Sequence, residues 1–526
     1  MHSFVFNNTQ MDIVLCIAPR ITDDFGYTPA GPALLKGSLS AAGFTSKIID
    51  LNAEIDQRFR HDSDAILQIN NFFEFFTFYN QDTWNIVSEM VDEWAKRLLS
   101  YNPKFVGISV FSYNSQRAAR LIAMRCKFYN PDVKIVIGGN GIATDFIFAE
   151  DLYQKGLIDY YIRGEGELAL VELLKGNTEY PGINGLPIQQ IKELDNLPFP
   201  DYDDYELKTY TNKKGLEALP ITGSRGCVRH CTFCDVSTLW PKYYWRSGTN
   251  IADEIIHQVN KYDARAFRFT DSLINGSIKG FREMISKLAE FRADMPDDKK
   301  FIWDSHFIIR GPTQMPPADF DMMAASGAST LLIGVESGSP TVRDHMKKGY
   351  SHDDLLYCME QLARVKVKCR LLMIIGYPTE TADDFQKTID MFTDFKKYND
   401  AGIIEEVNLG LTLNLLPKTP LHANKDRYKI VQPTDHINDW VCLDNPDLTY
   451  RERVRRRILA QAHCERLGYR VFEAKNYTKQ LFSSWKEIAN SGNSAEKVVI
   501  KGEFKFDREK GGIVGDVLTR DTFRTY

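Results

Sequence analysis

The first third of the chain alternates between short apolar runs and amphipathic stretches. The apolar runs are rich in Val and Ile, whereas residues 31–42 and 115–129 show helical spacing. Runs that are apolar at almost every position are typical of strands buried on both faces, as in parallel sheets with crossover helices. The pattern predicts a Rossmann-like parallel sheet within residues 1–185. Its expected strands lie near residues 12–18, 47–51, 105–110, 133–137 and 157–162.

Longer strand and helix units begin near residue 215. Six βα units in a row favour a partial (β/α)6 barrel of the TIM type over an open sheet. The expected fold class is α/β, with the Rossmann-like sheet followed by a barrel over residues 215–420 and a small C-terminal α+β domain over residues 421–526. Prolines and polar turns predict a linker over residues 186–214. The expected barrel strands are residues 219–223, 266–270, 301–307, 330–334, 369–376 and 407–415.

Composition and charge narrow the function classes. The 526 residues are 43% hydrophobic, enough for several cores, yet no apolar run reaches eighteen residues, so no membrane span is expected. A net charge of −5 with interspersed signs argues against a general nucleic-acid binder. The one basic run, residues 451–457, is predicted to be a solvated helix face rather than an RNA or phosphate site.

Three of the nine cysteines stand at Cys-x3-Cys-x2-Cys spacing on the loop after the first expected barrel strand, where barrels place catalytic groups. Three thiolates cannot ligate all four irons of a cubane cluster, so one iron would stay open for chemistry. The cysteine usage and the start of the chain favour a reduced, cytoplasmic setting. The expected metal ligands are Cys227, Cys231 and Cys234. The expected buried small hydrophobes are Cys16, Cys126, Cys358 and Cys369.

A structural zinc knuckle is the alternative use of these cysteines. Thiolate and imidazole both suit zinc, and His230 could supply the fourth ligand. However, His230 adjoins Cys231 in the sequence, and adjacent side chains poorly share one tetrahedral site. The sequence therefore favours an iron–sulfur cluster.

The cysteine spacing, with Phe233 before the last cysteine and a six-strand barrel around it, resembles the radical S-adenosylmethionine (SAM) superfamily. The resemblance implies that the thiolates hold a [4Fe-4S] cluster and that SAM chelates its open iron. It also implies cleavage of SAM to a 5′-deoxyadenosyl radical, with electrons from a donor such as flavodoxin or ferredoxin. A low-potential cluster can reduce the positively charged sulfonium, and burial and hydrogen bonds to sulfur tune its potential.

Further positions are similar to the SAM contacts of that superfamily. Phe233 would lie near the adenine, and Asp271 and Ser272 stand where the family usually carries a glycine-glycine-glutamate element. Arg246 could pair with the SAM carboxylate or make a surface salt bridge. The implied SAM contacts are Phe233, Arg246, Asp271, Ser272, Glu336, Ser337 and Gly376. The resemblance leaves the catalytic residues unknown.

The N-terminal sheet resembles the cobalamin-binding domain of the B12-type radical SAM enzymes. The resemblance rests on residues 29–35, 137–140 and 163–167. An Asp-x-His-x-x-Gly element, which supplies a histidine below cobalt in some corrinoid proteins, is absent from residues 1–185, and relatives without it exist. Glycines at strand ends can also serve only as turns. The implied cobalamin contacts are Ser109, Gly138, Gly139, Gly164 and Glu165.

The resemblance implies a radical SAM enzyme that transfers a methyl group through cobalamin to an unactivated carbon of a small-molecule or peptide substrate. The alternative is a cyclase or rearrangement enzyme whose N-terminal domain binds substrate or a partner. A methylthiotransferase is disfavoured because the N-terminal domain has no further three-cysteine set. Residues 421–526, with a helix expected over 449–467, are predicted to cap the barrel and shape the substrate pocket.

Overall fold

The structure is a computed structural model that describes most of the chain between residues 10 and 472 and two short segments beyond. The described residues are 10–19, 28–59, 61–74, 81–143, 146–210, 218–410, 412–472, 505–507 and 512–514. They divide into two compact units, one within residues 1–223 and 244–270 and the other within residues 224–243 and 271–526. The predicted domain boundaries are a separate division of the chain and stay predictions.

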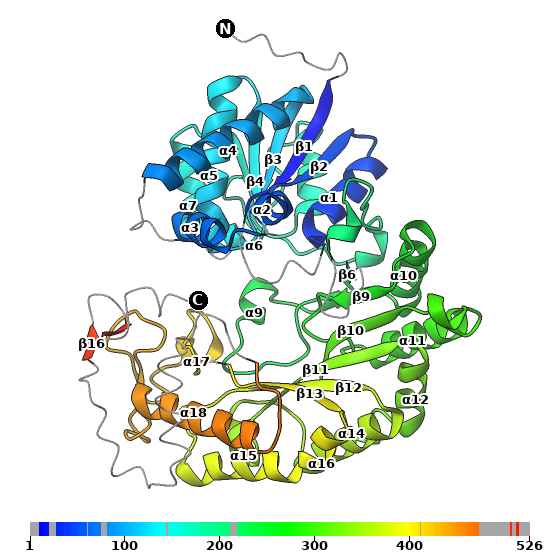
Figure 1. The fold of residues 1–526 in the computed structure, drawn as a ribbon, viewed down its shortest axis with the longest axis vertical. Helices are drawn as coiled ribbons and strands as arrows, with labels where there is room; N and C mark the ends of the chain where they lie inside the picture. Colours follow the sequence, from blue (N-terminus) through cyan, green and yellow to red (C-terminus); the bar gives the residue numbers. More distant parts are fainter. Residues whose placement is uncertain are drawn as a thin grey trace. The chain divides into compact units, whose positions relative to one another are not determined.

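The first unit contains a five-stranded parallel sheet with the order β2-β1-β3-β4-β5 (Figure 1). Its strands are β1 (Met11–Ile17), β2 (Ser46–Asp50), β3 (Pro103–Ser109), β4 (Lys134–Gly138) and β5 (Tyr160–Ile162). The helices between them are α1 (Ala30–Ala41), α2 (Leu51–Phe59), α3 (Ser63–Glu74), α4 (Gln81–Ser100), α5 (Gln116–Tyr129), α6 (Asn140–Ala143), α7 (Phe146–Gln154) and α8 (Gly166–Leu174). The predicted Rossmann-like sheet is confirmed.

The core of this sheet explains its sequence pattern. Val14, Val106 and Ile135 are 0% exposed and belong to one hydrophobic cluster with Trp94 of α4 and Ile122 of α5. Burial of apolar surface on this scale is the main favourable term in folding. Strands covered by helices need no polar face, which is why their apolar runs are continuous.

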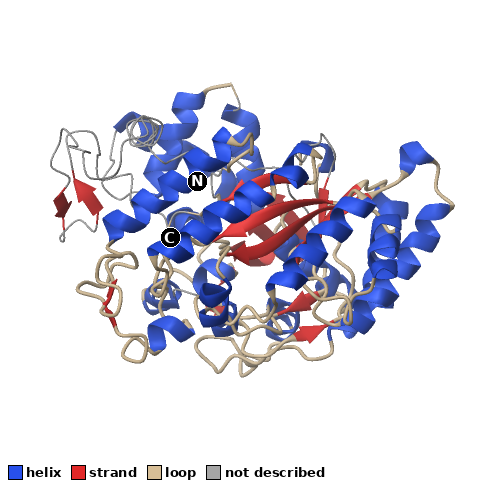
Figure 2. Ribbon diagram, turned by 90° about the horizontal axis from the view of Figure 1, so that it is seen from below, coloured by secondary structure: helices blue, strands red, loops and turns tan. Residues whose placement is uncertain are grey.

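A second sheet has six strands in the order β13-β12-β11-β10-β9-β6. The strands are β6 (Ala218–Ile221), β9 (Ala266–Phe269), β10 (Ile302–Phe307), β11 (Ala328–Glu336), β12 (Lys368–Met373) and β13 (Ile404–Asn408). The accompanying helices are α10 (Gly248–Tyr262), α11 (Ile278–Ala293), α12 (Pro317–Ala325), α13 (Pro340–His345), α14 (His352–Val365), α15 (Ala382–Asp394) and α16 (Lys396–Asp400). Each strand overlaps an expected barrel strand, but β13 ends at Asn408 and shares only residues 407–408 with the strand expected over 407–415. Figure 2 shows the strands lying among the helices.

The two faces of this sheet differ within the second unit. Leu331 and Cys369 are paired in register and are 0% exposed. Leu332 and Arg370, one residue further along the same strands, are only partly buried. Because successive side chains of a strand point to opposite faces, one face is fully covered and the other is partly open. This asymmetry fits the partial barrel that the sequence predicts.

Local sequence signals fix the starts of the helices near the strand ends. Helix α14 begins with a capping box between Ser351 and Asp354, and α15 begins with one between Thr381 and Asp384. Each box satisfies two backbone N–H groups that the first helical turn leaves unpaired. Helix α15 therefore starts directly after the loop that follows β12.

The last part of the chain contributes short elements and one long helix. They are α17 (Pro420–Ala423), β14 (Ile430–Val431), β15 (Val441–Cys442), α18 (Tyr450–Arg466), β16 (Lys505–Asp507) and β17 (Gly512–Val514). The remaining short elements are β7 (Ser224–Arg225), α9 (Val236–Leu239) and β8 (Tyr244–Trp245). Helix α18 confirms the helix expected over residues 449–467, and part of the predicted C-terminal domain lies outside the described residues.

One prediction about α18 is wrong. The basic run at residues 451–457 was expected to be a solvated helix face, but Arg453, Arg456 and Arg457 are 0%, 6% and 5% exposed. Their guanidinium groups are buried because backbone carbonyls and carboxylates of neighbouring segments accept their hydrogen bonds.

Within the described residues, none of the helices combines the length and the apolar character that crossing a lipid bilayer requires.

Candidate functional site

The three motif cysteines lie on the loop between β7 and α9. All nine cysteines of the chain are free thiols, and Cys231 is 9% exposed while Cys227 and Cys234 are partly buried. The loop turns at Gly226, whose φ is +90° and whose position leaves no room for a Cβ, since the carbonyl oxygen of Lys242 would lie 2.6 Å from it. Glycine is therefore required where the chain enters the motif.

Burial and mutual repulsion disfavour thiolates at these cysteines when no cation is present. Burial raises the pKa of each thiol, that of Cys234 to about 11, and interactions with the other motif cysteines add to the increase for Cys231 and Cys234. The backbone N–H of Arg229 donates to Cys227 Sγ at 3.4 Å and opposes the shift there. A positively charged metal centre would supply the missing stabilisation, because coordination deprotonates a thiol.

The structure does not bring the four ligands of the zinc alternative together at the motif. Among the residues that the structure describes, no three His, Cys, Asp or Glu side chains converge closely enough to hold one metal ion. Zinc needs four donors at about 2.0–2.3 Å from one point. The imidazole of His230, the fourth ligand of the zinc alternative, is exposed. The zinc alternative therefore finds no support in the geometry of the described residues.

A buried cation stands beside the cysteines. Lys348 Nζ lies 2.9 Å from Glu336 Oε1 and 5.9 Å from the centre of the Phe233 ring, and the ion pair is largely shielded from solvent. Burial lowers the pKa of Lys348, but the charges of Glu336, Cys231 and Cys227 raise it by more, so the net shift is upward. Lys348 therefore remains an ammonium group next to the thiols.

Glu336 owes its position to an uncommon backbone conformation at the end of β11. Its φ is +67°, a left-handed value that is rare for a residue with a side chain, and its carbonyl accepts the N–H of Ile374. Strained residues of this kind are concentrated at functional sites. Glycine at position 334 leaves space for the side chains of both Glu336 and Lys348.

Two other predicted SAM contacts follow β9. Asp271 is 2% exposed and accepts a hydrogen bond of 2.5 Å from Ser224 Oγ, three residues before Cys227. This contact brings Asp271 to the start of the cysteine loop. Ser272 is exposed.

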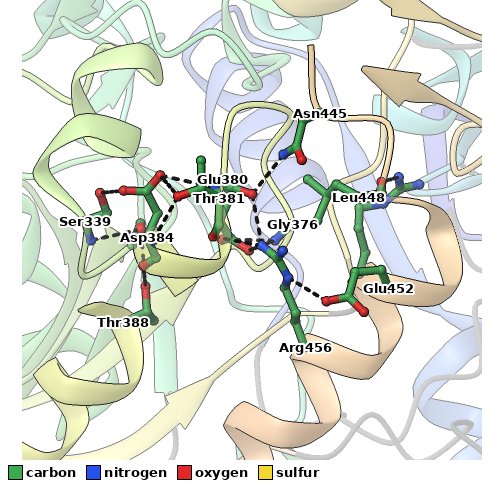
Figure 3. Close-up of polar contacts among 12 residues, drawn as sticks. Ser339, Gly376, Glu380, Thr381, Asp384, Thr388, Asn445, Leu448, Glu452 and Arg456 are labelled. Atoms are coloured by element: carbon green, nitrogen blue, oxygen red, sulfur yellow. Dashed lines mark hydrogen bonds and ion pairs between the residues drawn. The ribbon is translucent and has the colours of Figure 1, made fainter. Parts of the chain in front are cut away.

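The loop after β11 is fixed by helix α15 (Figure 3). Ser339 Oγ donates to Asp384 Oδ1 at 2.6 Å, and the Gly338 N–H donates to Thr388 Oγ1 at 3.0 Å. Ser337 is 0% exposed, and its hydroxyl lies 3.3 Å from that of Thr388. The predicted contact Ser337 is thus buried against α15. Its N–H donates to the Val335 carbonyl and its own carbonyl accepts from Arg343 Nη1, each at 2.9 Å, so its role as a SAM contact stays a prediction.

The loop after β12 contains the predicted contact Gly376. Its φ is +83°, and its N–H lies 3.2 Å from each carboxylate oxygen of Glu380, which is 0% exposed. Burial raises the pKa of Glu380 to about 7, while Arg456 and the Gly376 N–H oppose the increase. The loop is therefore closed on itself by a buried carboxyl group.

Arg246 serves a structural role in the first unit. It forms an ion pair with Glu254, which is 1% exposed, and donates to Asn250 Oδ1 at 2.6 Å and to the Thr222 carbonyl at 3.1 Å. These contacts occupy the guanidinium, so the structure does not support its expected pairing with the SAM carboxylate. Arg246 does form a salt bridge, as the alternative expected, but the pair is buried rather than at the surface.

The five predicted cobalamin contacts gather at the carboxyl ends of three neighbouring strands. Gly139, after β4, has φ +113°, and a Cβ there would lie 2.5 Å from the Val110 carbonyl oxygen. Glu165 is mostly buried and accepts the Ile191 N–H at 2.5 Å, which points to a loop-fixing role for its carboxylate. Ser109 ends β3, Gly138 ends β4 and Gly164, with φ +86°, follows β5.

Sequence reasoning missed two groups of residues at the sites. Phe111 and Tyr113, directly after β3, are 54% and 56% exposed, which is unusual for large aromatic side chains. Lys348 and Arg456 lie in runs of basic residues that look solvated. For Phe111 and Tyr113, the available sequence signal was their position after a predicted strand. For Lys348 and Arg456, the sequence contained no signal that the side chains would be buried.

Two family models match the chain. The radical SAM superfamily model covers residues 221–392, and the B12 binding domain model covers residues 21–174. Both match the regions in which the candidate sites lie. The resemblance drawn from the sequence is confirmed.

Curated relatives are distant and longer than the matched region. An uncharacterized methyltransferase of Pyrococcus horikoshii is 24% identical, with 56% of this chain and 65% of the relative aligned. The cytidylyl-2-hydroxyethylphosphonate methyltransferase of Streptomyces wedmorensis is 23% identical, with 59% and 65% aligned. The anaerobic magnesium-protoporphyrin IX monomethyl ester cyclase of Rubrivivax gelatinosus is 23% identical, with 58% and 56% aligned. The alignments thus span less than two thirds of each of these relatives.

Solved structures share the fold over most of the chain. The radical SAM methyltransferase TsrM from Kitasatospora setae, with cobalamin and a [4Fe-4S] cluster bound, has a TM-score of 0.58 at 18% identity, covering 85% of this chain and 81% of TsrM. The cobalamin-dependent SAM radical enzyme OxsB, with aqua-cobalamin bound, has a TM-score of 0.62 at 14% identity, covering 91% of this chain and 72% of OxsB. These similarities support the α/β architecture described above.

Proposed function

We propose that this chain, which combines a radical SAM domain with a B12-binding domain, cleaves SAM at a [4Fe-4S] cluster and transfers a methyl group through cobalamin to an unactivated carbon. The observation that carries the proposal is the partly buried loop on which Cys227, Cys231 and Cys234 lie together as free thiols. Three thiolates leave one iron of a cubane without a protein ligand, and that iron can bind SAM.

Residues around the cysteines would prepare this site for its cofactor. When bound, the cluster would supply one electron to the SAM sulfonium, and cobalamin would supply a methyl carrier. The Lys348 ammonium would offset the negative charge of the thiolates, with Glu336 keeping it in place. The loops after β11 and β12, fixed through Asp384 and Glu380, would present backbone groups to SAM.

The strand ends of the first unit support the cobalamin part of the proposal. Glycines at positions 138, 139 and 164 lie where ligands of parallel α/β sheets bind, outside the carboxyl ends of strands. His61, the one described histidine within residues 1–185, is exposed between α2 and α3 rather than at a strand end. We therefore propose that cobalt receives no histidine from this domain.

The proposal extends to the setting of the reaction. A small-molecule or peptide substrate, a donor such as flavodoxin or ferredoxin and a cytoplasmic location agree with free cysteines and with a low-potential cluster. The relative from Rubrivivax gelatinosus is a cyclase, so ring closure is the second candidate reaction.

Anaerobic reconstitution with iron, sulfide and hydroxocobalamin tests both cofactors at once. Visible spectra report the cluster and the corrinoid, and mass spectrometry identifies the products of SAM. We expect 5′-deoxyadenosine together with S-adenosylhomocysteine, since methylation of cobalamin and formation of the radical use separate SAM molecules. 5′-Deoxyadenosine alone would favour cyclisation or rearrangement. Protein that binds iron but no corrinoid would make the N-terminal domain a substrate or partner module.

A further inference from the structure

Helix α18 places three arginines in the protein interior rather than in solvent. Arg453, Arg456 and Arg457 all lie in the run at residues 451–457 and are at most 6% exposed. Burying a guanidinium is unfavourable unless its charge and its N–H groups find partners. The hydrogen-bond partners of these arginines therefore show which segments the buried face of α18 stabilises.

Arg456 is bonded to the end of the loop that follows β12. Its Nη1 donates to Glu380 Oε1 at 3.1 Å, to the Glu380 carbonyl at 2.9 Å and to the Thr381 carbonyl at 3.0 Å (Figure 3). Its Nε donates to Glu452 Oε1 at 2.9 Å on the preceding turn of α18. The planar guanidinium can reach these acceptors together, which the single ammonium of a lysine cannot do in the same geometry.

Glu380 connects Arg456 to Gly376 through hydrogen bonds. The same carboxylate that meets Arg456 accepts the Gly376 N–H with both oxygens at 3.2 Å. Asn445 Nδ2 adds bonds to the carbonyls of Pro378 and Glu380 at 3.2 and 2.9 Å. The turn at residues 376–380 is thus fixed from inside by its own carboxyl group and from outside by α18.

The other two arginines strengthen the same attachment. A Cβ at Gly376 would lie 2.6 Å from Arg453 Cγ, so the stem of Arg453 packs directly on this glycine. The guanidinium of Arg453 lies 3.7 Å from the centre of the Trp440 ring. Arg457 Nε donates to the Gly410 carbonyl at 3.0 Å, on the segment after β13. The buried face of α18 therefore contacts the carboxyl-end loops of two adjacent strands.

The contacts continue to a third loop. Thr381, whose carbonyl Arg456 binds, caps α15, and Asp384 in the first turn of α15 bonds Ser339 after β11. Ligands of barrel enzymes bind at these loops. A displacement of α18 would therefore move backbone on two loops where SAM contacts are predicted.

We propose that Arg456 is a positioning residue for SAM, acting through Glu380 to set the backbone of the Gly376 turn. The inference rests on the proposed function, because it assumes that SAM binds at this loop. Helix α18 lies beyond the radical SAM match at residues 221–392, so a segment outside that match shapes the cofactor site.

The test compares Arg456→Gln and Arg456→Lys with the matched control Arg455→Gln. Arg455 is the adjacent residue and has a side chain that is 32% exposed. Its guanidinium donates to Glu452, as that of Arg456 does, but not to Glu380. Each variant is reconstituted anaerobically, its iron and sulfide are measured, and its affinity for SAM is determined by equilibrium dialysis. Hydrogen exchange at the Gly376 amide, without SAM, reports the loop itself.

We expect Arg456→Gln to weaken SAM binding about tenfold or more at unchanged iron content, since a buried carboxylate loses its charged partner. Gly376 exchange should become faster, whereas Arg455→Gln should stay within about twofold of the original protein for both readouts. Arg456→Lys should give an intermediate loss, because it keeps the charge but has a single nitrogen, which cannot donate to Glu452 and to the Glu380 turn in the geometry of Nε and Nη1.

Unchanged SAM affinity in Arg456→Gln would overturn the inference and leave the proposed function intact. If the original reconstituted protein binds no SAM, the proposed function fails and the inference fails with it. Should Arg456→Gln not fold, the Arg456→Lys variant decides, and full SAM affinity there would refute the need for the guanidinium.

Discussion

The carboxyl ends of the two parallel sheets are built in different ways. At the N-terminal sheet, backbone packs on backbone: Gly139 and Gly141 lie against the main chain of Val110 and Ser112. At the barrel strands of the second unit, ionised side chains are buried instead, as in the pairs Lys348–Glu336 and Arg456–Glu380. The two proposed sites would therefore lie at strand ends of different chemical character.

The difference teaches what each edge can bind. Glycines that pack closely on neighbouring backbone let a ligand approach the main chain at this edge, which suits a large ring such as a corrin. Buried charges cost free energy unless they are paired, so they are retained where a charged ligand is to be oriented or an electron is to be received. Each of the following predictions removes one feature from one edge and leaves the other edge intact.

The largest effect is expected at the cysteine loop. Replacing Cys227, Cys231 or Cys234 by Ala removes one of three ligands, and the remaining two cannot hold a cubane cluster. Iron and sulfide in the reconstituted protein should fall close to zero, and formation of 5′-deoxyadenosine should fall to background. Corrinoid binding should persist, because it is assigned to the other sheet.

Val228→Ala is the matched control for the cysteine variants. Val228 follows Cys227 and is 37% exposed, so its truncation changes the loop surface without removing a ligand. It should retain the cluster and the cleavage of SAM. Substantial 5′-deoxyadenosine from any single cysteine variant would refute the assignment of the three ligands.

A smaller effect is expected at the N-terminal edge. Gly139→Val adds a β-branched side chain at φ +113°, 2.5 Å from the Val110 carbonyl oxygen, so strain and overlap should destabilise the first unit by about 2–4 kcal/mol. Urea unfolding measures this loss. Titration with hydroxocobalamin should show corrinoid binding weakened about tenfold or more, while the reconstituted cluster still cleaves SAM.

Gly31→Ala provides the comparison for this variant. Gly31 lies in α1 with no atom within 4 Å of the position of a Cβ, so the substitution should change stability by at most about 1 kcal/mol, in the favourable direction. A Gly139→Val protein as stable as Gly31→Ala, with full corrinoid affinity, would show that this edge is not the cobalamin site.

The sequence predicts one edge better than the other for a physical reason. Continuous apolar runs predicted β1 to β5, because a strand buried on both faces has no polar face. Glycine at a strand end predicts that another backbone segment or a ligand approaches the main chain there. The cysteine motif can also be predicted from the sequence, because its ligands are close together along the chain and their spacing is typical of a cluster-binding loop. These features need only neighbouring residues, so the chain order displays them.

The charged contacts could not be predicted because the sequence does not show which acceptor each cation meets in the fold. Arg456 meets Glu380 across 76 residues, and its basic run looks like a solvent-facing helix until the acceptors on the other side are known. Arg246 was expected to bind SAM, yet it pairs with Glu254 two turns along the chain. The positive φ of Glu336, which positions the partner of Lys348, has no sequence signal.

The smallest effect is expected from Lys348 at the charged edge. Lys348→Met removes a buried cation beside Cys227 and Cys231, and reduction adds negative charge to the cluster that these thiolates hold. The midpoint potential should therefore become more negative, on the order of 60 mV or tenfold in the one-electron equilibrium. Dithionite titration followed by electron paramagnetic resonance measures it without SAM or substrate.

Two controls separate the charge of Lys348 from other effects of its loss. Lys347→Met removes the adjacent, exposed ammonium and should leave the potential unchanged, because solvent screens it. The double variant Lys348→Met with Glu336→Gln removes both charges of the pair and should shift the potential less than Lys348→Met alone, since no unpaired carboxylate remains beside the cluster. Equal potentials for Lys348→Met and Lys347→Met would mean that the buried pair maintains the shape of the loop rather than its charge, and the contrast between the two edges would then rest on the cysteines alone.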